Sequence, residues 1–98
     1  MGNEVRRVRI TRGAAQTRAA QPLRDREILA ASISSLEYNP YPDGLRHIPG
    51  QPDNFFAYRI GEYRVTFIDN VETATIHVLA IWKKVDEVLT FLTEDSNK

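Results

Sequence analysis

Two arginines stand on either side of the pair Gly61-Glu62, in a segment where apolar and polar residues alternate. A Gly-X pair between two alternating runs is typical of a two-residue type II′ hairpin turn. The register of such a hairpin places Arg59 directly opposite Arg64. Like charges in that position destabilise a sheet by about 0.2–1 kcal/mol, so an anion is expected nearby. Because guanidinium groups bind phosphate oxygens bidentately, one interpretation of the pair is a phosphate site.

A second interpretation needs no ligand. The two arginines could pair with carboxylates of the same chain, such as Glu62, Asp69 or the acidic residues near the C-terminus, or they could extend into water. Solvated charges on a sheet are common, and a single exposed arginine carries no information about a ligand. The residues alone leave the two interpretations open.

Further basic residues are expected near the same end of the sheet. The last predicted strand ends at Lys83 and Lys84, and antiparallel pairing with the preceding strand brings this end toward Arg64. Arg46 follows a proline-rich loop and is expected to approach from the strand before the hairpin. His47 lies beside Arg46, and a histidine can act as an acid or base near neutral pH. Together these residues predict one basic concavity.

Composition excludes several kinds of chemistry. The chain has no Cys, which excludes disulfides, thiol catalysis and Cys-containing zinc sites. With two His residues an all-His metal site is not expected, and His77 is interpreted as a hydrogen-bonded residue of a strand. The sequence has no Gly-rich phosphate loop and no Ser/His/Asp arrangement. No metal and no cofactor are therefore expected.

Charge is distributed unevenly along a chain whose formal net charge is zero. Residues 1–26 carry +5, residues 27–84 carry −2 and residues 85–98 carry −3. The neutral total gives no support for a nucleic-acid partner, but it allows a local basic patch. The apolar runs are far shorter than the ~20 residues that cross a bilayer, and no signal peptide is recognisable. We expect a soluble cytoplasmic protein with one domain over residues 1–98.

The elements that must position these side chains follow the order β-α-α-β-β-β-α. Strands are predicted over residues 5–10, 55–60, 63–69 and 73–82, helices over 11–20 and from 22 to about 38, and a short C-terminal helix within 85–98. A broken edge strand is possible near 45–48, where prolines are frequent. The fold class is therefore α+β, an antiparallel sheet with a helical hairpin packed on one face.

The hairpin also predicts which side chains share a face of the sheet. The core face collects Phe56, Tyr58, Ile60, Tyr63, Val65 and Phe67. The other face collects Phe55, Ala57, Arg59, Arg64, Thr66 and Ile68. On the second helix, an apolar stripe is predicted from Leu23, Ile28, Leu29, Ile33 and Leu36.

Four segments of the chain resemble the RelE/ParE superfamily of bacterial type II toxin–antitoxin toxins. They are Leu36-Glu37-Tyr38-Asn39-Pro40, Leu45-Arg46-His47-Ile48-Pro49-Gly50, Tyr58-Arg59-Ile60-Gly61-Glu62-Tyr63-Arg64-Val65 and Trp82-Lys83-Lys84. The third segment is the most specific, and the resemblance covers about residues 5–84. It implies a β-α-α-β-β-β fold, a small cytoplasmic protein and an antitoxin as its protein partner.

The resemblance also implies an activity and residue roles. RelE-like members cleave mRNA in the ribosomal A site without a metal, by attack of a ribose 2′-OH on the adjacent phosphate. By position, Arg64 corresponds to the arginine that stabilises the transferring phosphate, with Lys84 and Lys83 as the basic residues at the end of the last strand. Arg46 and Arg59 correspond to residues that position the RNA, and His47 is a candidate beside them.

Two alternatives within the same fold remain open. Many RelE-like nucleases carry a catalytic Tyr about four residues beyond the terminal basic residue, where this chain has Val88. Its absence is compatible with a ParE-like inhibitor that binds DNA gyrase and has no nuclease chemistry. It is also compatible with a catalytically silent module that binds an antitoxin. The expected partners are thus an antitoxin together with either the ribosome and mRNA or DNA gyrase.

Overall fold

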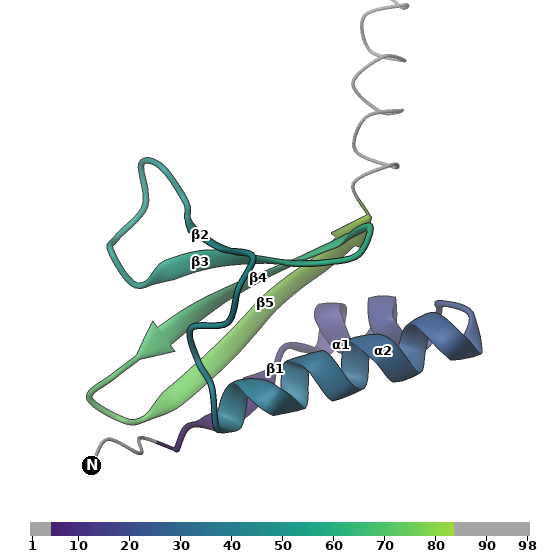
Figure 1. Cartoon of the computed structure of the whole chain (residues 1–98), viewed down its shortest axis with the longest axis horizontal. Coiled ribbons are helices and arrows are strands. Elements are labelled where there is room, and N and C mark those ends of the chain that lie inside the picture. Colours follow the sequence, from purple (N-terminus) through teal and green to yellow (C-terminus); the bar gives the residue numbers. More distant parts are fainter. Residues whose placement is uncertain (1–4, 84–98) are drawn as a thin grey trace, which may run out of the picture.

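The structure, a computed structural model, describes residues 5–83 as one sheet with two helices (Figure 1). The strands are β1 (Arg7–Ile10), β2 (Leu45–His47), β3 (Phe55–Ile60), β4 (Tyr63–Asn70) and β5 (Thr75–Lys83). The helices are α1 (Arg12–Ala19) and α2 (Leu23–Ser34), and a single 3-10 turn, η1 (Ser35–Glu37), follows α2. The strand order is β1-β5-β4-β3-β2.

The predicted α+β class with helices on one face of the sheet is confirmed. β2 to β5 pair antiparallel, as predicted, whereas β1 joins the edge of β5 in the parallel direction. The possible strand near 45–48 is present as the short edge strand β2. The predicted C-terminal helix lies outside the described residues.

The helices form where capping residues and apolar spacing favour them. The side chain of Thr11 accepts a hydrogen bond from the backbone N–H of Ala14 at 3.2 Å, which caps α1. α2 begins directly after Pro22. Its buried residues are Leu29 and Ile33, and Leu36 of η1 continues the stripe. The prediction that Leu23 and Ile28 belong to this stripe is wrong, because they are 61% and 47% exposed.

The core lies between the helical hairpin and the face of the sheet predicted from the hairpin. Its buried apolar residues are Ala14, Leu29, Ile33, Leu36, Ile60, Tyr63, Val65, Phe67, Ile76, Val78 and Ile81. Phe56 and Tyr58 pack against this cluster from β3. Burial of these side chains supplies the main driving force for folding. The helices therefore occupy one side of the sheet, with β2 and β3 at the edge far from β1 (Figure 1).

The β3–β4 hairpin has the predicted turn and the predicted register. Gly61 has φ +59° and Glu62 does not have a positive φ, which is the type II′ pattern. Every predicted pair is present: Phe56 opposite Phe67, Tyr58 opposite Val65, Arg59 opposite Arg64 and Ile60 opposite Tyr63. The face with the arginines is therefore the face turned away from the helices, which we call the open face.

A buried ion pair ties the start of the chain to β4, and the sequence reading missed it. The Nε of Arg6 donates to Oδ1 of Asp69 at 2.7 Å, and Nη2 donates to Oδ2 at 3.3 Å. Arg6 is 3% exposed and Asp69 is 2% exposed. The hydroxyl of Tyr41 donates to the same carboxylate. This hydrogen bond, together with burial, raises the pKa of Tyr41.

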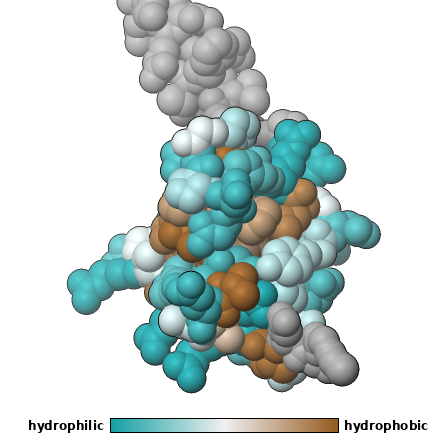
Figure 2. Space-filling model, turned by 90° about the vertical axis from the view of Figure 1, so that its left-hand side faces the viewer, coloured by the Kyte–Doolittle hydropathy of each residue, from teal (hydrophilic) through white to brown (hydrophobic). Residues whose placement is uncertain are grey.

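The side of the molecule shown in Figure 2 carries no single continuous hydrophobic patch. Hydrophobic side chains there emerge as separate patches between hydrophilic ones (Figure 2). Scattered apolar residues of this kind are normal for a folded protein. Within residues 5–83, no helix is both long and apolar enough to cross a membrane.

Candidate functional site

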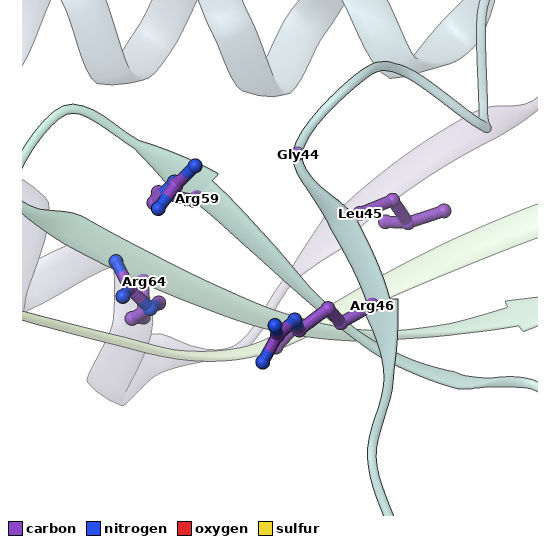
Figure 3. A pocket seen from close by; sticks show the side chains of 6 residues that line it. Gly44, Leu45, Arg46, Arg59 and Arg64 are labelled. Atoms are coloured by element: carbon purple, nitrogen blue, oxygen red, sulfur yellow. The ribbon is translucent and has the colours of Figure 1, made fainter.

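A pocket of about 300 Å³ opens on the open face near the β3–β4 turn. It is lined by Gly44, Leu45, Arg46, Ala57, Arg59 and Arg64. The three arginines come from three neighbouring strands, β2, β3 and β4. Their side chains gather on one side of the β2 ribbon, whereas Leu45 points the other way (Figure 3).

Hairpin geometry brings the side chains of Arg59 and Arg64 close together. In a two-residue hairpin the pair next to the turn, Ile60 and Tyr63, is hydrogen-bonded. The next pair, Arg59 and Arg64, is therefore non-hydrogen-bonded, and the Cα atoms of such a pair lie about 4.5 Å apart. The backbone N–H of Arg59 points to the outer side of β3, where it donates to the carbonyl of Gly44 at 3.1 Å.

Arg46 reaches the same pocket from the edge strand. Its Cα partner in the ladder is Ala57, which lies two residues from Arg59 and so on the same face. The side chain of Ala57 is only a methyl group, so it leaves space between the three guanidinium groups. Arg46 and Arg59 are exposed and Arg64 is partly buried. The pocket is thus open at its rim and closed around the base of Arg64.

Gly44 shapes the rim of the pocket. It has φ +87°, a conformation that residues with a Cβ rarely adopt. A Cβ at this position would lie 3.3 Å from the carbonyl oxygen of Arg59. The absence of a side chain therefore lets the loop before β2 turn close to β3, and this sets where Arg46 enters the pocket.

The arginines of the pocket have no described counter-charge. Within residues 5–83, the side chains of Arg46, Arg59 and Arg64 form no hydrogen bond or salt bridge. Nη1 of Arg64 is buried and has no hydrogen-bond partner there. A buried donor without a partner costs about 1–3 kcal/mol, more when it is charged. An anion in the pocket would remove this cost.

The carboxylate interpretation finds no support within the described residues. Asp69 points to the core face and binds Arg6. Glu62 is exposed at the turn and makes no salt bridge with either arginine. The acidic residues near the C-terminus lie outside the described part of the chain.

The structure does not bring Lys83 into the pocket. Lys83 pairs with Tyr63, so its side chain lies on the helix-covered face, with Nζ 5.6 Å from the centroid of the Tyr63 ring. Trp82 takes the place opposite Arg64 on the open face. The strand ends lie side by side as expected, but the expectation that Lys83 joins the basic concavity with Arg64 is wrong. Lys84 lies outside the described residues.

His47 also lies away from the pocket. It pairs with Phe56 on the core side, where the two rings meet edge to face at 6.3 Å. Its Nε2 donates to the carbonyl oxygen of Pro52 at 2.9 Å. His77 lies on the open face of β5, between Arg9 of β1 and Ile68 of β4. Neither histidine lines the pocket.

The pocket can bind an anion but holds no described proton acceptor. Three guanidinium groups supply N–H donors and positive charge. A phosphodiester fits this donor set because each guanidinium can contact two oxygens. The sequence did not predict Gly44, Leu45 and Ala57 as lining residues. A signal for Gly44 was present, because the pair Asp43-Gly44 before a short strand is typical of a turn. In the described range, no group of three or more His, Cys, Asp or Glu residues could hold a metal ion.

Comparison with known proteins connects this fold to solved structures of RelE toxins. No family model and no curated protein matches the sequence. The RelE–RelB complex from Pyrococcus horikoshii contains a chain with 22% identity and a TM-score of 0.69, and the match covers 82% of this chain and 96% of that one. RelBE2 from Mycobacterium tuberculosis matches at 24% identity and a TM-score of 0.64, over 81% and 98%.

The match does not depend on a bound antitoxin in the compared structure. The isolated RelE toxin of E. coli has 14% identity, a TM-score of 0.68 and coverage of 89% of this chain and 98% of that one. The chain therefore has the fold of the RelE toxins. The resemblance found in the sequence segments is confirmed at this level.

Proposed function

We propose that this protein is the toxin of a type II toxin–antitoxin system and cleaves mRNA on the ribosome, as a RelE-type endoribonuclease. The observation that carries the proposal is the arginine pocket on the open face, with the buried and unpartnered Nη1 of Arg64 at its base. Such a donor is satisfied by an anion, and the phosphate of an RNA backbone supplies one. The RelE fold supports the same assignment.

In the proposed reaction, a ribose 2′-OH attacks the adjacent phosphorus and the bond to the 5′-oxygen of the next nucleotide breaks. A cyclic phosphate and a free 5′-hydroxyl result. Negative charge increases on the phosphate oxygens in the transition state, and Arg64 donates to them. Arg46 and Arg59 hold the phosphodiester in line for attack. Because arginine cannot accept the 2′-OH proton, we assign this step to Lys84, the residue that follows β5 in the sequence, acting as a neutral amine. The ammonium that forms then donates the proton to the departing 5′-oxygen.

The proposal includes the partners and the location of the protein. An antitoxin would hold the toxin inactive, as expected from the RelE–RelB complexes among the similar structures. The ribosome and its mRNA would be the targets, in the cytoplasm. The reaction as written needs no metal and no cofactor.

Arg64→Ala is the sharpest test of this function. Toeprinting on purified ribosomes with a defined message should show cleavage by the wild type. Removing a donor that binds the transition-state charge typically lowers the rate by about 10²–10³. Arg24→Ala removes the same charge from the exposed side of α2 and should cleave normally. Intact message with wild-type protein in excess would refute the nuclease proposal, as would full activity of Arg64→Ala.

A non-catalytic member of the same fold is the second candidate. It is favoured by one observation: none of the lining residues can accept a proton. A ParE-like protein would block supercoiling by DNA gyrase in vitro and leave mRNA intact. A silent module would bind an antitoxin but would not arrest growth when expressed alone. Supercoiling and growth assays with the wild-type chain separate these outcomes.

A further inference from the structure

A second pair of arginines lies on the open face, at the edge opposite β2. In β1, Val8 and Ile10 pack against the core, so Arg7 and Arg9 point to the other side. The ladder confirms this placement, because Arg9 pairs with His77 of β5. Both arginines are exposed, and within residues 5–83 neither side chain forms a hydrogen bond or salt bridge.

An aromatic and apolar surface separates the two arginine groups. The strands place these residues on it: Phe55, Ala57, Thr66, Ile68, His77, Ala80 and Trp82. No described strand contributes an Asp or Glu side chain to the open face, since Asp69 lies on the core side. The described strands thus place five arginines and several aromatic rings on the open face, and no carboxylate.

The distance between the arginine pocket and the pair Arg7 and Arg9 suits a short polymer with regularly spaced charges. Two strand spacings of about 4.8 Å and four residues of about 3.3 Å separate Arg64 from Arg9, so their Cα atoms lie roughly 16 Å apart. A single phosphate in the pocket cannot reach both groups. A chain of a few nucleotides can, with its bases over the rings of Trp82 and His77.

We infer that the open face is the path of an extended single RNA strand, which runs from the arginine pocket across β5 to a second phosphate site at Arg7 and Arg9. This inference rests on the proposed function and extends it, because it names residues outside the pocket that hold the substrate. Proteins that bind single strands combine basic grooves with aromatic surfaces in this way. Arg7 and Arg9 hold the RNA and take no part in the bond-breaking step.

The test compares binding of long and short RNA. An RNA of about eight nucleotides, 2′-O-methylated so that it cannot be cut, spans the face, whereas one of about two nucleotides fills only the pocket. Fluorescence anisotropy over a salt series measures the slope of log K against log salt, to which each phosphate contact in a single strand contributes about 0.7. Because the two arginines hold one phosphate, Arg7→Gln/Arg9→Gln should lower the slope for the long RNA by about 0.7. The same double variant should bind the short RNA with the affinity of the wild type.

The controls separate this inference from the proposed function. Arg18→Gln/Arg24→Gln removes the same charge from the two helices and should keep the wild-type slope. Arg7→Lys/Arg9→Lys keeps the charge and should also keep it. An unchanged slope in the Gln double variant refutes the second site, as does a wild type that binds no long RNA.

One further result would also refute the second site. If Arg7→Gln/Arg9→Gln loses affinity for poly-glutamate but not for RNA, the face serves an acidic protein segment instead. If RNA binding depends on Arg7 and Arg9 but the protein does not cleave mRNA on ribosomes, the second site is supported and the proposed nuclease function is refuted.

Discussion

The buried ion pair between Arg6 and Asp69 should be the most sensitive point of the fold. In Asp69→Asn, the amide has nearly the shape of the carboxylate but no charge. The guanidinium of Arg6 is 3% exposed and would lose the buried carboxylate that its Nε and Nη2 contact. Breaking a buried pair by removing one partner costs about 3–5 kcal/mol. This is a large share of the roughly 5–15 kcal/mol by which small domains are stable.

Thermal and urea unfolding of the full chain measure this loss. For a domain of this size about 1 kcal/mol corresponds to about 4–8 °C, so the Tm should fall by roughly 15–30 °C. Asp53→Asn, at an exposed position in a loop, is the matched control and should stay within about 0.5 kcal/mol of the wild type. A loss below about 1 kcal/mol in Asp69→Asn would show that the charge of Arg6 is solvated in solution and would refute the reasoning.

A double replacement tests the cause. In Arg6→Met/Asp69→Leu both charges leave, and the site becomes apolar at similar volume. Replacements of this kind are often neutral or stabilising, because the desolvation of two ions is no longer required. We therefore expect the double variant to be more stable than Asp69→Asn alone. If it is as unstable as the single variant, packing rather than charge explains the loss.

Three further changes have expected outcomes. Gly44→Ala should destabilise the protein by about 1–2 kcal/mol in urea unfolding, through its positive φ and its contact with the Arg59 carbonyl, and should weaken phosphate binding in titrations. The hydrogen bond to Asp69 raises the pKa of Tyr41 in the folded state, so the protonated hydroxyl contributes its full stabilisation below pH 10 and loses it as the pH rises further. Above pH 10 the free energy of unfolding should therefore fall in the wild type, and fall less in Tyr41→Phe. Tyr63→Phe removes a 2.7 Å hydrogen bond to a carboxylate of α2 and should cost about 1–2 kcal/mol in thermal unfolding.

The controls for these changes use residues that share one property with the site. Gly50 also has a positive φ but has nothing within 4 Å of an added Cβ, so Gly50→Ala isolates the backbone cost. Tyr38 is 75% exposed, and Tyr38→Phe should change neither the pH profile nor the stability. Equal losses in Gly44→Ala and Gly50→Ala would mean that the rim of the pocket tolerates a side chain.

The hairpin could be predicted because its information is local. Gly61 and the alternation around it determine the turn, the register and therefore the facing pair of arginines. The pair Arg6 and Asp69 is 63 residues apart in sequence, and no turn connects the two. A signal was present nonetheless. Arg6 alternates in phase with Val8 and Ile10, and an arginine on a buried face requires a carboxylate partner.

Lys83 could not be placed correctly because of a β-bulge. The ladder between β4 and β5 shifts by one residue between Thr66 and Phe67. A one-residue shift moves every later side chain to the other face of the sheet. Without it, Trp82 would lie on the core side and Lys83 on the open face. The bulge instead turns the indole toward Arg64 and the lysine toward the ring of Tyr63, and no residue type in the sequence marks its position.

The parallel edge of the sheet has a consequence for biosynthesis. β1 begins at Arg7, and its strand partner among residues 5–83, β5, begins at Thr75. During synthesis, β5 must therefore emerge from the ribosomal exit tunnel before β1 can pair with it. Contacts between the two extremes of a chain form late and slowly, because a long loop has to close first. The edge of the sheet that carries Arg7 and Arg9 is therefore completed after the local β3–β4 hairpin has formed.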